Sequence, residues 1–212
     1  MTPVVTDDLT GKYASCLEKQ GHEGRMRRFL IAIAAVVAAS SVHSETVQHD
    51  PTTVYALPFK SGSCVYVFMT YDESVHVGDH RFAVDFAVPI GTQVLAARDG
   101  VVSGTGAAPR SPNDEPGTTR GDYVWVRHRD GTVATYLHLR HNGAAVALGQ
   151  AVKAGQLLGY SGCTGHCTAG MLHFQVSTPM PPGDDYKTFP TVFKIAKDSV
   201  EFLQSNRCYL VP

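Results

Sequence analysis

Three polar residues in otherwise apolar surroundings are candidates for chemistry: Asp85, His138 and His173. Asp85 lies within Ala-Val-Asp-Phe-Ala, where a carboxylate is costly to bury unless it is paired or bound to a metal. His138 is flanked by two leucines, and His173 by Leu172 and Phe174. Two histidines and a carboxylate are a usual ligand set for catalytic zinc, with a fourth position left for water. The pattern therefore indicates that separate strands bring these side chains to one hydrolytic metal site.

Met171 stands beside this set. If residues 171–175 form a strand, side chains 171 and 173 point to one face, while Leu172 and Phe174 point to the other. His173 then enters a cleft with Met171 next to it. Methionine is only a weak acceptor and carries no titratable proton, so Met171 cannot act as a general base.

The elements that position these residues are predicted to be short strands. From residue 54 onward, β-rich runs alternate with glycine, proline and Asp-Gly pairs, which are strong hairpin signals. One strand is expected at Val65–Met69. Asp-Gly turns are expected at 99–100, between strands at 93–97 and 101–102, and at 130–131, between strands at 123–128 and 133–137. We expect an all-β, antiparallel, single domain, sandwich-like or barrel-like, with long surface loops.

Two segments break this pattern. Residues 107–120 have no periodic core pattern and are interpreted as a long, mobile surface loop at the rim of the cleft. Residues Thr191 to Gln204 are the only helical candidate.

The front of the chain has the pattern of an export signal. Met26-Arg27-Arg28 precedes an apolar run from Phe29 to Ala39 and then small residues up to Ser44. The run is shorter than the about 20 residues that span a bilayer. We therefore expect a signal peptide at 26–44, with no stable membrane span after cleavage; an uncleaved signal-anchor is the alternative. Residues 1–25 are interpreted as a mis-assigned extension, with a genuine cytoplasmic extension as the rival, and 45–53 as a linker.

Export implies an oxidising compartment, either the periplasm or the exterior. The exported part contains Cys64, Cys163, Cys167 and Cys208, which allow three pairings. We favour Cys163–Cys167 and Cys64–Cys208. A zinc knuckle built from Cys163, His166 and Cys167 is an alternative that lacks an obvious fourth ligand. The formal net charge of −1 gives no sign of a nucleic-acid partner.

Many ordered motifs make the chain from about Val54 to its C-terminus resemble the lysostaphin-type (LytM-like) zinc metallopeptidases, which cut peptidoglycan cross-bridges. The resemblance is carried by the segments 74–78 (Ser-Val-His-Val-Gly), 82–92 (Phe-Ala-Val-Asp-Phe-Ala-Val-Pro-Ile-Gly-Thr), 94–102, 128–132, 136–139 (Tyr-Leu-His-Leu), 149–156, 161–165 and 172–174 (Leu-His-Phe). It implies that residues 54–212 are a metallopeptidase domain.

Carried over by position, the resemblance implies one Zn²⁺ held by His76, Asp85 and His173, with His138 as the catalytic histidine near the metal. His80, five residues before Asp85, is the alternative first ligand; the Ser-x-His-x-Gly motif favours His76. The family's last motif reads His-Leu-His, and its first histidine assists catalysis; here that position is Met171.

Three further histidine interpretations stay open. His80 would be a rim residue if His76 binds the metal, and His128, before an Asp-Gly turn, is expected to be structural. His166, in the loop between Cys163 and Cys167, is an alternative replacement for the missing histidine.

Two functions follow from the resemblance. The first is an exported zinc metalloendopeptidase that hydrolyses peptide bonds of peptidoglycan cross-links, weakened by Met171. The second is a catalytically degenerate domain of the same fold that binds peptidoglycan or activates another cell-wall hydrolase. Retention of all three ligand positions favours at least metal binding. The peptidoglycan peptide is the expected partner in either case.

Overall fold

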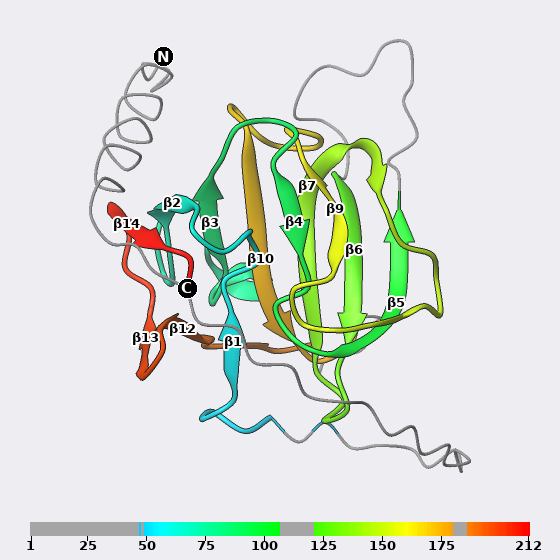
Figure 1. Ribbon diagram of the computed structural model, residues 1–212, viewed down its shortest axis with the longest axis horizontal. Helices are drawn as coiled ribbons and strands as arrows, with labels where there is room; N and C mark the ends of the chain where they lie inside the picture. The colour runs from blue at the N-terminus through cyan, green and yellow to red at the C-terminus, as the bar shows by residue number, and fades with distance from the viewer. Residues whose placement is uncertain (1–46, 48, 107–120, 180–185) are drawn as a thin grey trace.

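The structure is a computed structural model that describes residue 47 and residues 49–106, 121–179 and 186–212 (Figure 1). The predicted signal peptide and the predicted loop at 107–120 lie outside these ranges. The described residues form short β-strands and one 3-10 turn, η2, with these bounds: β1 Val54–Ala56, β2 Cys64–Met69, η2 Gly78–His80, β3 Val84–Ala87, β4 Gln93–Leu95, β5 Gly100–Gly106, β6 Asp122–Arg127, β7 Val133–Ala144, β8 Ala151–Val152, β9 Leu157–Ser161, β10 Met171–Ser177, β11 Thr188–Phe189, β12 Val192–Ala196, β13 Ser199–Phe202 and β14 Arg207–Leu210.

The strands form two sheets, and the predicted all-β, antiparallel fold is confirmed. The large sheet runs in the order β14-β2-β3-β10-β7-β6-β5-β8, with β9 bridging β7 and β4. Its two ends do not pair with each other among the described strands, so it is an open sheet and not a closed barrel. The small sheet has the order β1-β12-β13, and β1 with β12 is the one parallel pair that the described residues form.

Strand β10 is an interior strand of the large sheet and lies between β3 and β7 (Figure 1). One of its faces carries Leu172, Phe174 and Val176, each at most 1% exposed. Burying an apolar side chain of this size contributes about 1.5–3 kcal/mol. The rings of Tyr136 and Phe193 pack edge-on against Phe174, at centroid distances of 5.3 and 5.5 Å. The opposite face of β10 is therefore held in place by a well-packed core.

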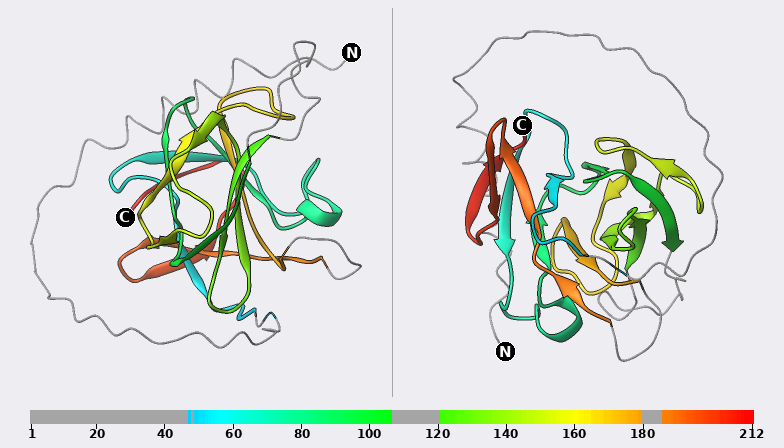
Figure 2. Two further views of the ribbon diagram at one scale, coloured as in Figure 1. Left: turned by 90° about the vertical axis from the view of Figure 1, so that its right-hand side faces the viewer. Right: turned by 90° about the horizontal axis from the view of Figure 1, so that it is seen from below.

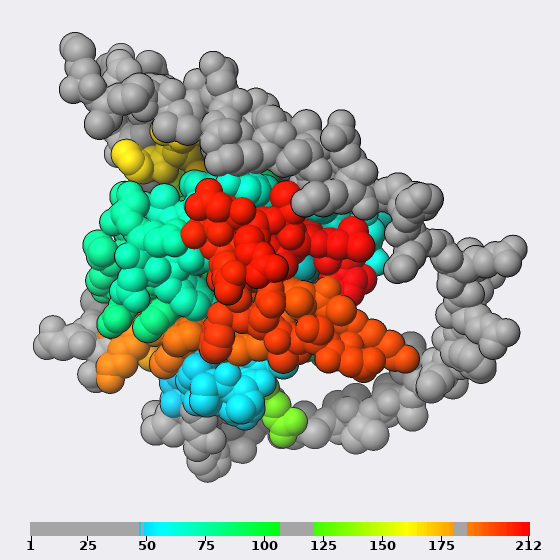
Figure 3. All heavy atoms as spheres, turned by 90° about the vertical axis from the view of Figure 1, so that its left-hand side faces the viewer, coloured from blue at the N-terminus to red at the C-terminus, as the bar shows by residue number. Residues whose placement is uncertain are grey.

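The C-terminal strands pack beside segments from the first half of the chain. In Figures 2 and 3, β12 to β14, in orange and red, lie against the cyan and green segments of β1 to β3. The helical prediction for Thr191 to Gln204 is wrong, since this stretch forms the hairpin of β12 and β13. Alternation explains the strands: Phe193 is fully buried while Lys194 is exposed, which gives a two-residue period.

One Asp-Gly prediction is confirmed and the other is wrong. Residues 130–131 lie in the turn between β6 and β7, which pair along most of their length. Residues 99–100 do not form a hairpin turn, because β4 pairs with β9 and β5 pairs with β6 and β8. Asp99 instead binds Lys153, whose Nζ lies 2.7 Å from its carboxylate, and accepts the backbone N–H of Ala154 at 2.8 Å.

The two predicted cysteine pairings have different outcomes. Cys163 and Cys167 form a disulfide with a Cα–Cα distance of 5.5 Å. Cys64–Cys208 is wrong as a disulfide: no such bond is present, because Cys64 stands opposite Leu210 and Cys208 opposite Tyr66. Diagonal neighbours on paired strands are about 7–8 Å apart, beyond ordinary disulfide reach. Across the residues that the structure describes, no helix is long and apolar enough to span a membrane.

His128 is a buried histidine that should couple stability to pH. Its Nδ1–H donates to the carbonyl oxygen of Asp99 at 2.8 Å, and burial lowers its pKa to about 4. Between pH 4 and 6.5 the unfolded chain therefore binds more protons than the folded chain. We expect the free energy of unfolding to fall by up to about 3 kcal/mol as the pH drops through this window, measured by denaturant titration. The variant His128→Gln should lose this part of the slope; an unchanged slope would contradict the assignment.

Candidate metal centre

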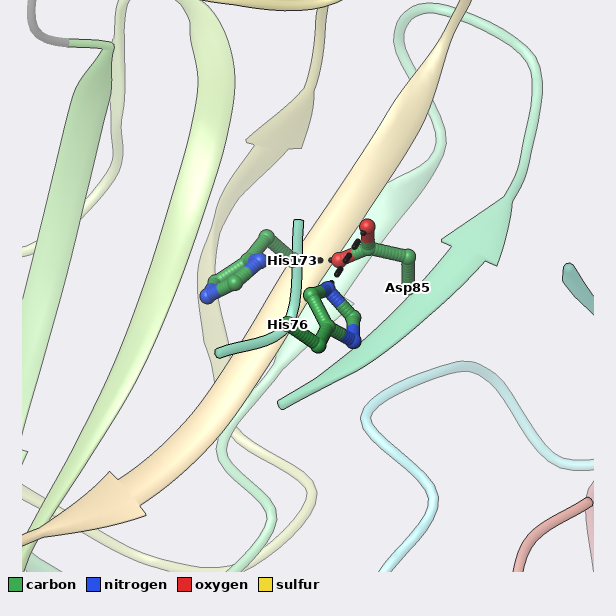
Figure 4. A group of neighbouring side chains, drawn as sticks. All are labelled: His76, Asp85 and His173. Atoms are coloured by element: carbon green, nitrogen blue, oxygen red, sulfur yellow. Dashed lines mark hydrogen bonds and ion pairs between the residues drawn. The ribbon is translucent and has the colours of Figure 1, made fainter. Parts of the chain in front are cut away.

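Three predicted ligand residues meet at one point (Figure 4). Nε2 of His76 lies 3.1 Å from Oδ2 of Asp85, and Nδ1 of His173 lies 2.8 Å from Oδ1 of the same carboxylate. All three side chains are buried, and each offers one ligand atom within 4.8 Å of the other two. They form the only such group of histidine, cysteine and acidic residues in the described part of the chain.

The two sheet residues are brought together by strand register. His173 on β10 is the direct cross-strand partner of Asp85 on β3. His76 comes from the loop between β2 and β3, and its Nδ1 lies 2.7 Å from the carbonyl oxygen of Thr70. The Thr70 N–H in turn donates to the carboxylate of Glu73 at 2.9 Å, which secures the start of this loop. Hydrogen bonds within the loop therefore hold His76 beside Asp85.

The hydrogen bonds fix which ring nitrogens face the carboxylate. Because Nδ1 of His76 donates to Thr70, its Nε2 carries a lone pair toward Asp85. Nε2 of His173 donates to Oε1 of Gln175 at 3.1 Å, so its Nδ1 also carries a lone pair toward Asp85.

This arrangement fits a divalent cation. In the neutral tautomers, two imidazole lone pairs face a carboxylate across about 3 Å, which is repulsive unless a positive charge lies between them. Oδ1 of Asp85 is buried and accepts no hydrogen bond of good geometry, although His173 is near it. Nitrogen and carboxylate ligands of this kind suit zinc.

The electrostatics of the cluster favour an ionised carboxylate. Burial alone would raise the pKa of Asp85, but when the imidazoles of His173 and His76 carry protons toward it, their charge and hydrogen bonds outweigh burial and hold that pKa well below its usual range. For His76, burial acts to lower the pKa, and the Asp85 carboxylate more than offsets it, so the net pKa is raised. Asp85 thus supplies a permanent negative charge.

His138 approaches the cluster from β7, and a β-bulge aims it. Leu137 pairs with Tyr123 and Leu139 with Asp122, which leaves His138 as the extra residue on its strand. Its φ of 64° is left-handed, a conformation that costs about 1–3 kcal/mol and is concentrated at functional sites. Its ring centroid lies 5.9 Å from that of His173.

The tautomer of His138 is also fixed by its surroundings. Nδ1–H donates to the carbonyl oxygen of Thr164 at 2.7 Å, so Nε2 is left with a lone pair. Burial lowers the pKa of His138 and keeps the ring neutral. Oγ1 of Thr164 donates to the carbonyl oxygen of Leu139 and accepts the N–H of Asp122, which holds the loop against β7.

Gly121 leaves the space that this hydrogen bond needs. A Cβ there would lie 2.7 Å from the carbonyl oxygen of Thr164 and 3.2 Å from Nδ1 of His138. We expect Gly121→Ala to break the bond between them and to cost about 1–3 kcal/mol of stability through overpacking. Imidazole ¹⁵N NMR should show His138 as a mixture of tautomers.

A matched variant separates strain from loss of this bond. In Gly100→Ala the new Cβ would lie 2.5 Å from the carbonyl oxygen of Arg127, a backbone clash elsewhere in the sheet. Gly100→Ala should lose stability and keep the His138 spectrum unchanged. An unaltered His138 spectrum in Gly121→Ala would contradict the role given to this glycine.

A cleft of about 430 Å³ opens over the cluster. Met171 lines it, is 8% exposed and pairs through its N–H with the carbonyl oxygen of Gly162 at 3.0 Å. His80 and His166 line it too, but neither belongs to the three-residue cluster. Cys163 and Cys167 are paired with each other and do not belong to the three-residue cluster, so the zinc-knuckle alternative gains no support from the described residues. His128 is not among the lining residues.

Sequence reasoning missed the residues that orient the imidazoles, namely Thr70, Thr164 and Gln175. Only Gln175 had a sequence signal. It follows His173 by two positions, so it shares the face of that ligand, and a glutamine there is expected to be buried. Thr70 and Thr164 act through backbone carbonyls, which any residue type provides.

A family model, Peptidase family M23, matches residues 79–184, half of the chain. The match begins three residues after His76, so the cluster draws one member from outside it. Among curated proteins, the glycyl-glycine endopeptidase ALE-1 of Staphylococcus capitis is 34% identical over 134 residues, which is 63% of this chain and 33% of that protein. The peptidoglycan DD-endopeptidase ShyC of Vibrio cholerae is 36% identical over 96 residues, which is 45% of this chain and 19% of that protein. The chain thus spans a third or less of these relatives.

Solved structures give similar matches. Lysostaphin from Staphylococcus simulans aligns with a TM-score of 0.45 and 28% identity over 58% of this chain and 47% of that chain. A zinc-containing peptidase from Vibrio cholerae aligns with a TM-score of 0.42 and 27% identity, covering 58% of this chain and 36% of that chain.

Proposed function

Because the chain belongs to peptidase family M23, we propose that it is an exported zinc metalloendopeptidase that hydrolyses peptide bonds of peptidoglycan cross-links. His76, Asp85 and His173 are the proposed zinc ligands, and His138 is the proposed catalytic residue. The observation that carries the proposal is the buried Asp85 carboxylate, approached within 3.1 Å by a lone-pair nitrogen of each ligand histidine. The similarity to a glycyl-glycine endopeptidase and to a peptidoglycan DD-endopeptidase supports the substrate class.

The residues of the chain divide the reaction between them. Zinc, when bound, supplies a Lewis acid that polarises the scissile carbonyl and acidifies water. His138 accepts the proton of the attacking water at Nε2, which the bond from Nδ1–H to Thr164 keeps unprotonated. Burial of the ring keeps it neutral before the proton arrives. Nε2 of His138 then donates that proton to the scissile amide nitrogen as the carbon–nitrogen bond breaks, so that the group leaves as a neutral amine.

Met171 lowers the expected rate. It lines the cleft at the position where the resemblance implies a second imidazole, and its thioether neither donates nor accepts a proton. Loss of one such group typically costs a factor of about 10² to 10⁴. The proposed enzyme is therefore slow for its family.

The test is peptide release from purified peptidoglycan, with zinc content measured on the same sample. We expect about one zinc ion per chain and slow release of peptides that a chelator abolishes and added zinc restores. Stoichiometric zinc without any chelator-sensitive release would overturn the enzymatic proposal.

That outcome would leave the second candidate, a domain that binds peptidoglycan or activates another cell-wall hydrolase. One observation favours it: Met171, which carries no titratable proton, lines the cleft at the position where the resemblance implies a histidine. Sedimentation with insoluble peptidoglycan, and addition to assays of a separate hydrolase, would identify this role.

The proposed location is the periplasm or the cell exterior. The similarity to ShyC, a peptidoglycan DD-endopeptidase, supports it. The proposed division of the chain is an extension at 1–25, a signal peptide at 26–44, a linker at 45–53 and the peptidase domain at 54–212. N-terminal sequencing of the exported protein, with an expected start at Glu45, tests this division.

A further inference from the structure

One face of β10 carries a row of three polar side chains and one methionine. Met171, His173, Gln175 and Ser177 alternate with the core residues of the same strand, and all four are at most 8% exposed. His173 is a proposed ligand, and Met171 lines the cleft beside it. Gln175, which is 2% exposed, belongs to neither the ligand set nor the catalytic residue.

The side-chain oxygen of Gln175 accepts hydrogen bonds from two imidazoles. Nε2 of His173 lies 3.1 Å from Oε1 of Gln175, and Nδ1 of His80 lies 3.0 Å from the same atom. The rings of His80 and His173 pack edge-on at a centroid distance of 5.3 Å. One amide oxygen therefore joins a ligand histidine to a second histidine that lines the cleft.

The amide nitrogen of Gln175 is held separately. It donates to the hydroxyl oxygen of Tyr186 at 2.6 Å. Tyr186 thereby occupies the NH₂ side of the amide. The oxygen side is left for the two imidazoles.

We propose that Gln175 is a positioning residue that sets the tautomer of His173 for metal binding and fixes His80 at the wall of the cleft. This inference rests on the proposed function, because it concerns the same metal site. Oε1 can only accept, so His173 must place its proton on Nε2 and turn the Nδ1 lone pair toward Asp85. Partners of this kind orient ligand histidines and raise their basicity.

The opposite orientation of the Gln175 amide would give His173 the other tautomer. If NH₂ faced the two histidines, Nε2 of His173 would have to accept, and its proton would move to Nδ1. That proton would point at Asp85 and form an ordinary hydrogen bond, which closes the site to a cation. The state of Gln175 therefore decides between a metal site and a His–Asp hydrogen bond.

The test compares two variants that separate the oxygen acceptor from the volume of the side chain. Gln175→Glu keeps an acceptor facing His173, whereas Gln175→Met keeps the length and apolar bulk and removes it. Zinc affinity is measured by competition with a chromogenic chelator. Imidazole ¹⁵N NMR of the zinc-free protein reports the tautomer of His173 independently of activity.

We expect Gln175→Met to bind zinc about 10- to 100-fold more weakly than the unchanged protein, the usual cost of losing such a partner. Its His173 should populate both tautomers. Gln175→Glu should retain zinc affinity and the Nε2–H tautomer. Gln156→Met is the control, because it removes an amide oxygen that accepts the N–H of Lys153 at 3.1 Å, away from the cleft. It should leave both readouts unchanged.

Each result is decisive. Equal zinc affinity and an unchanged His173 tautomer in a folded Gln175→Met variant would overturn the role of Gln175 and leave the proposed function standing. Equal losses in the Glu and Met variants would reduce Gln175 to a packing residue and overturn it as well. Failure of the unchanged protein to bind zinc would overturn this inference together with the proposed metal site.

Discussion

Asp85→Asn is expected to eliminate zinc binding and chelator-sensitive peptide release together. The substitution keeps the shape of the side chain and removes the one negative charge that both ligand histidines face. Loss of an outer partner weakens metal affinity about 10- to 100-fold, and loss of a direct charged ligand should exceed that. Zinc content after gel filtration and the release assay give the two readouts.

Asp72→Asn is the matched control for this prediction. Asp72 pairs with Arg81 at 2.7 Å on the exposed surface, with both side chains more than half exposed. Such a pair contributes about 0–1 kcal/mol, so this variant should keep its zinc and its activity. Full zinc occupancy in a folded Asp85→Asn protein would remove Asp85 from the ligand set.

Met171→His should raise the rate of peptide release by about 10²-fold or more, the size of effect that one proton-transferring group supplies. Position 171 lies on the same face of β10 as His173, opposite Ala87 on β3, and lines the cleft. An imidazole there adds the proton carrier that the site lacks. The measurement is kcat/KM on a soluble cross-linked peptide at fixed zinc.

Met171→Leu separates chemistry from packing, because leucine fills similar volume and carries no proton. It should remain as slow as the unchanged protein. If Met171→His binds zinc but gains no rate, the slow step does not involve a group at this position. The second candidate, a binding or activating domain, would then gain support.

Much of the fold, and the clustering of His76, Asp85 and His173, could be predicted because both follow from alternation and local motifs. The two-residue period of β10 separates Leu172 and Phe174 from His173 in the sequence itself. Asp85, a lone carboxylate among apolar residues, signals a buried partner for the same reason. His76 was assigned from its motif, and the structure places it beside Asp85 while His80 lies outside the cluster.

The parts that sequence could not predict depend on long-range pairing. Asp99-Gly100 has the composition of a hairpin turn, yet distant strands β9 and β8 take the places beside β4 and β5. The bulge at His138 arises from a shift in pairing between β6 and β7, and no residue type marks it. Thr164 orients His138 through a main-chain oxygen, which leaves no trace in composition.

A shared strand ties the geometry of the proposed metal site to the packing of the core. Since side chains along β10 alternate between cleft and core, inserting or deleting one residue before His173 would exchange the two faces. Phe174 would then enter the cleft, and His173 would enter the apolar interior. The cleft face of this strand can therefore change its chemistry only by substitution at fixed length. A single substitution at Met171 would place an imidazole there.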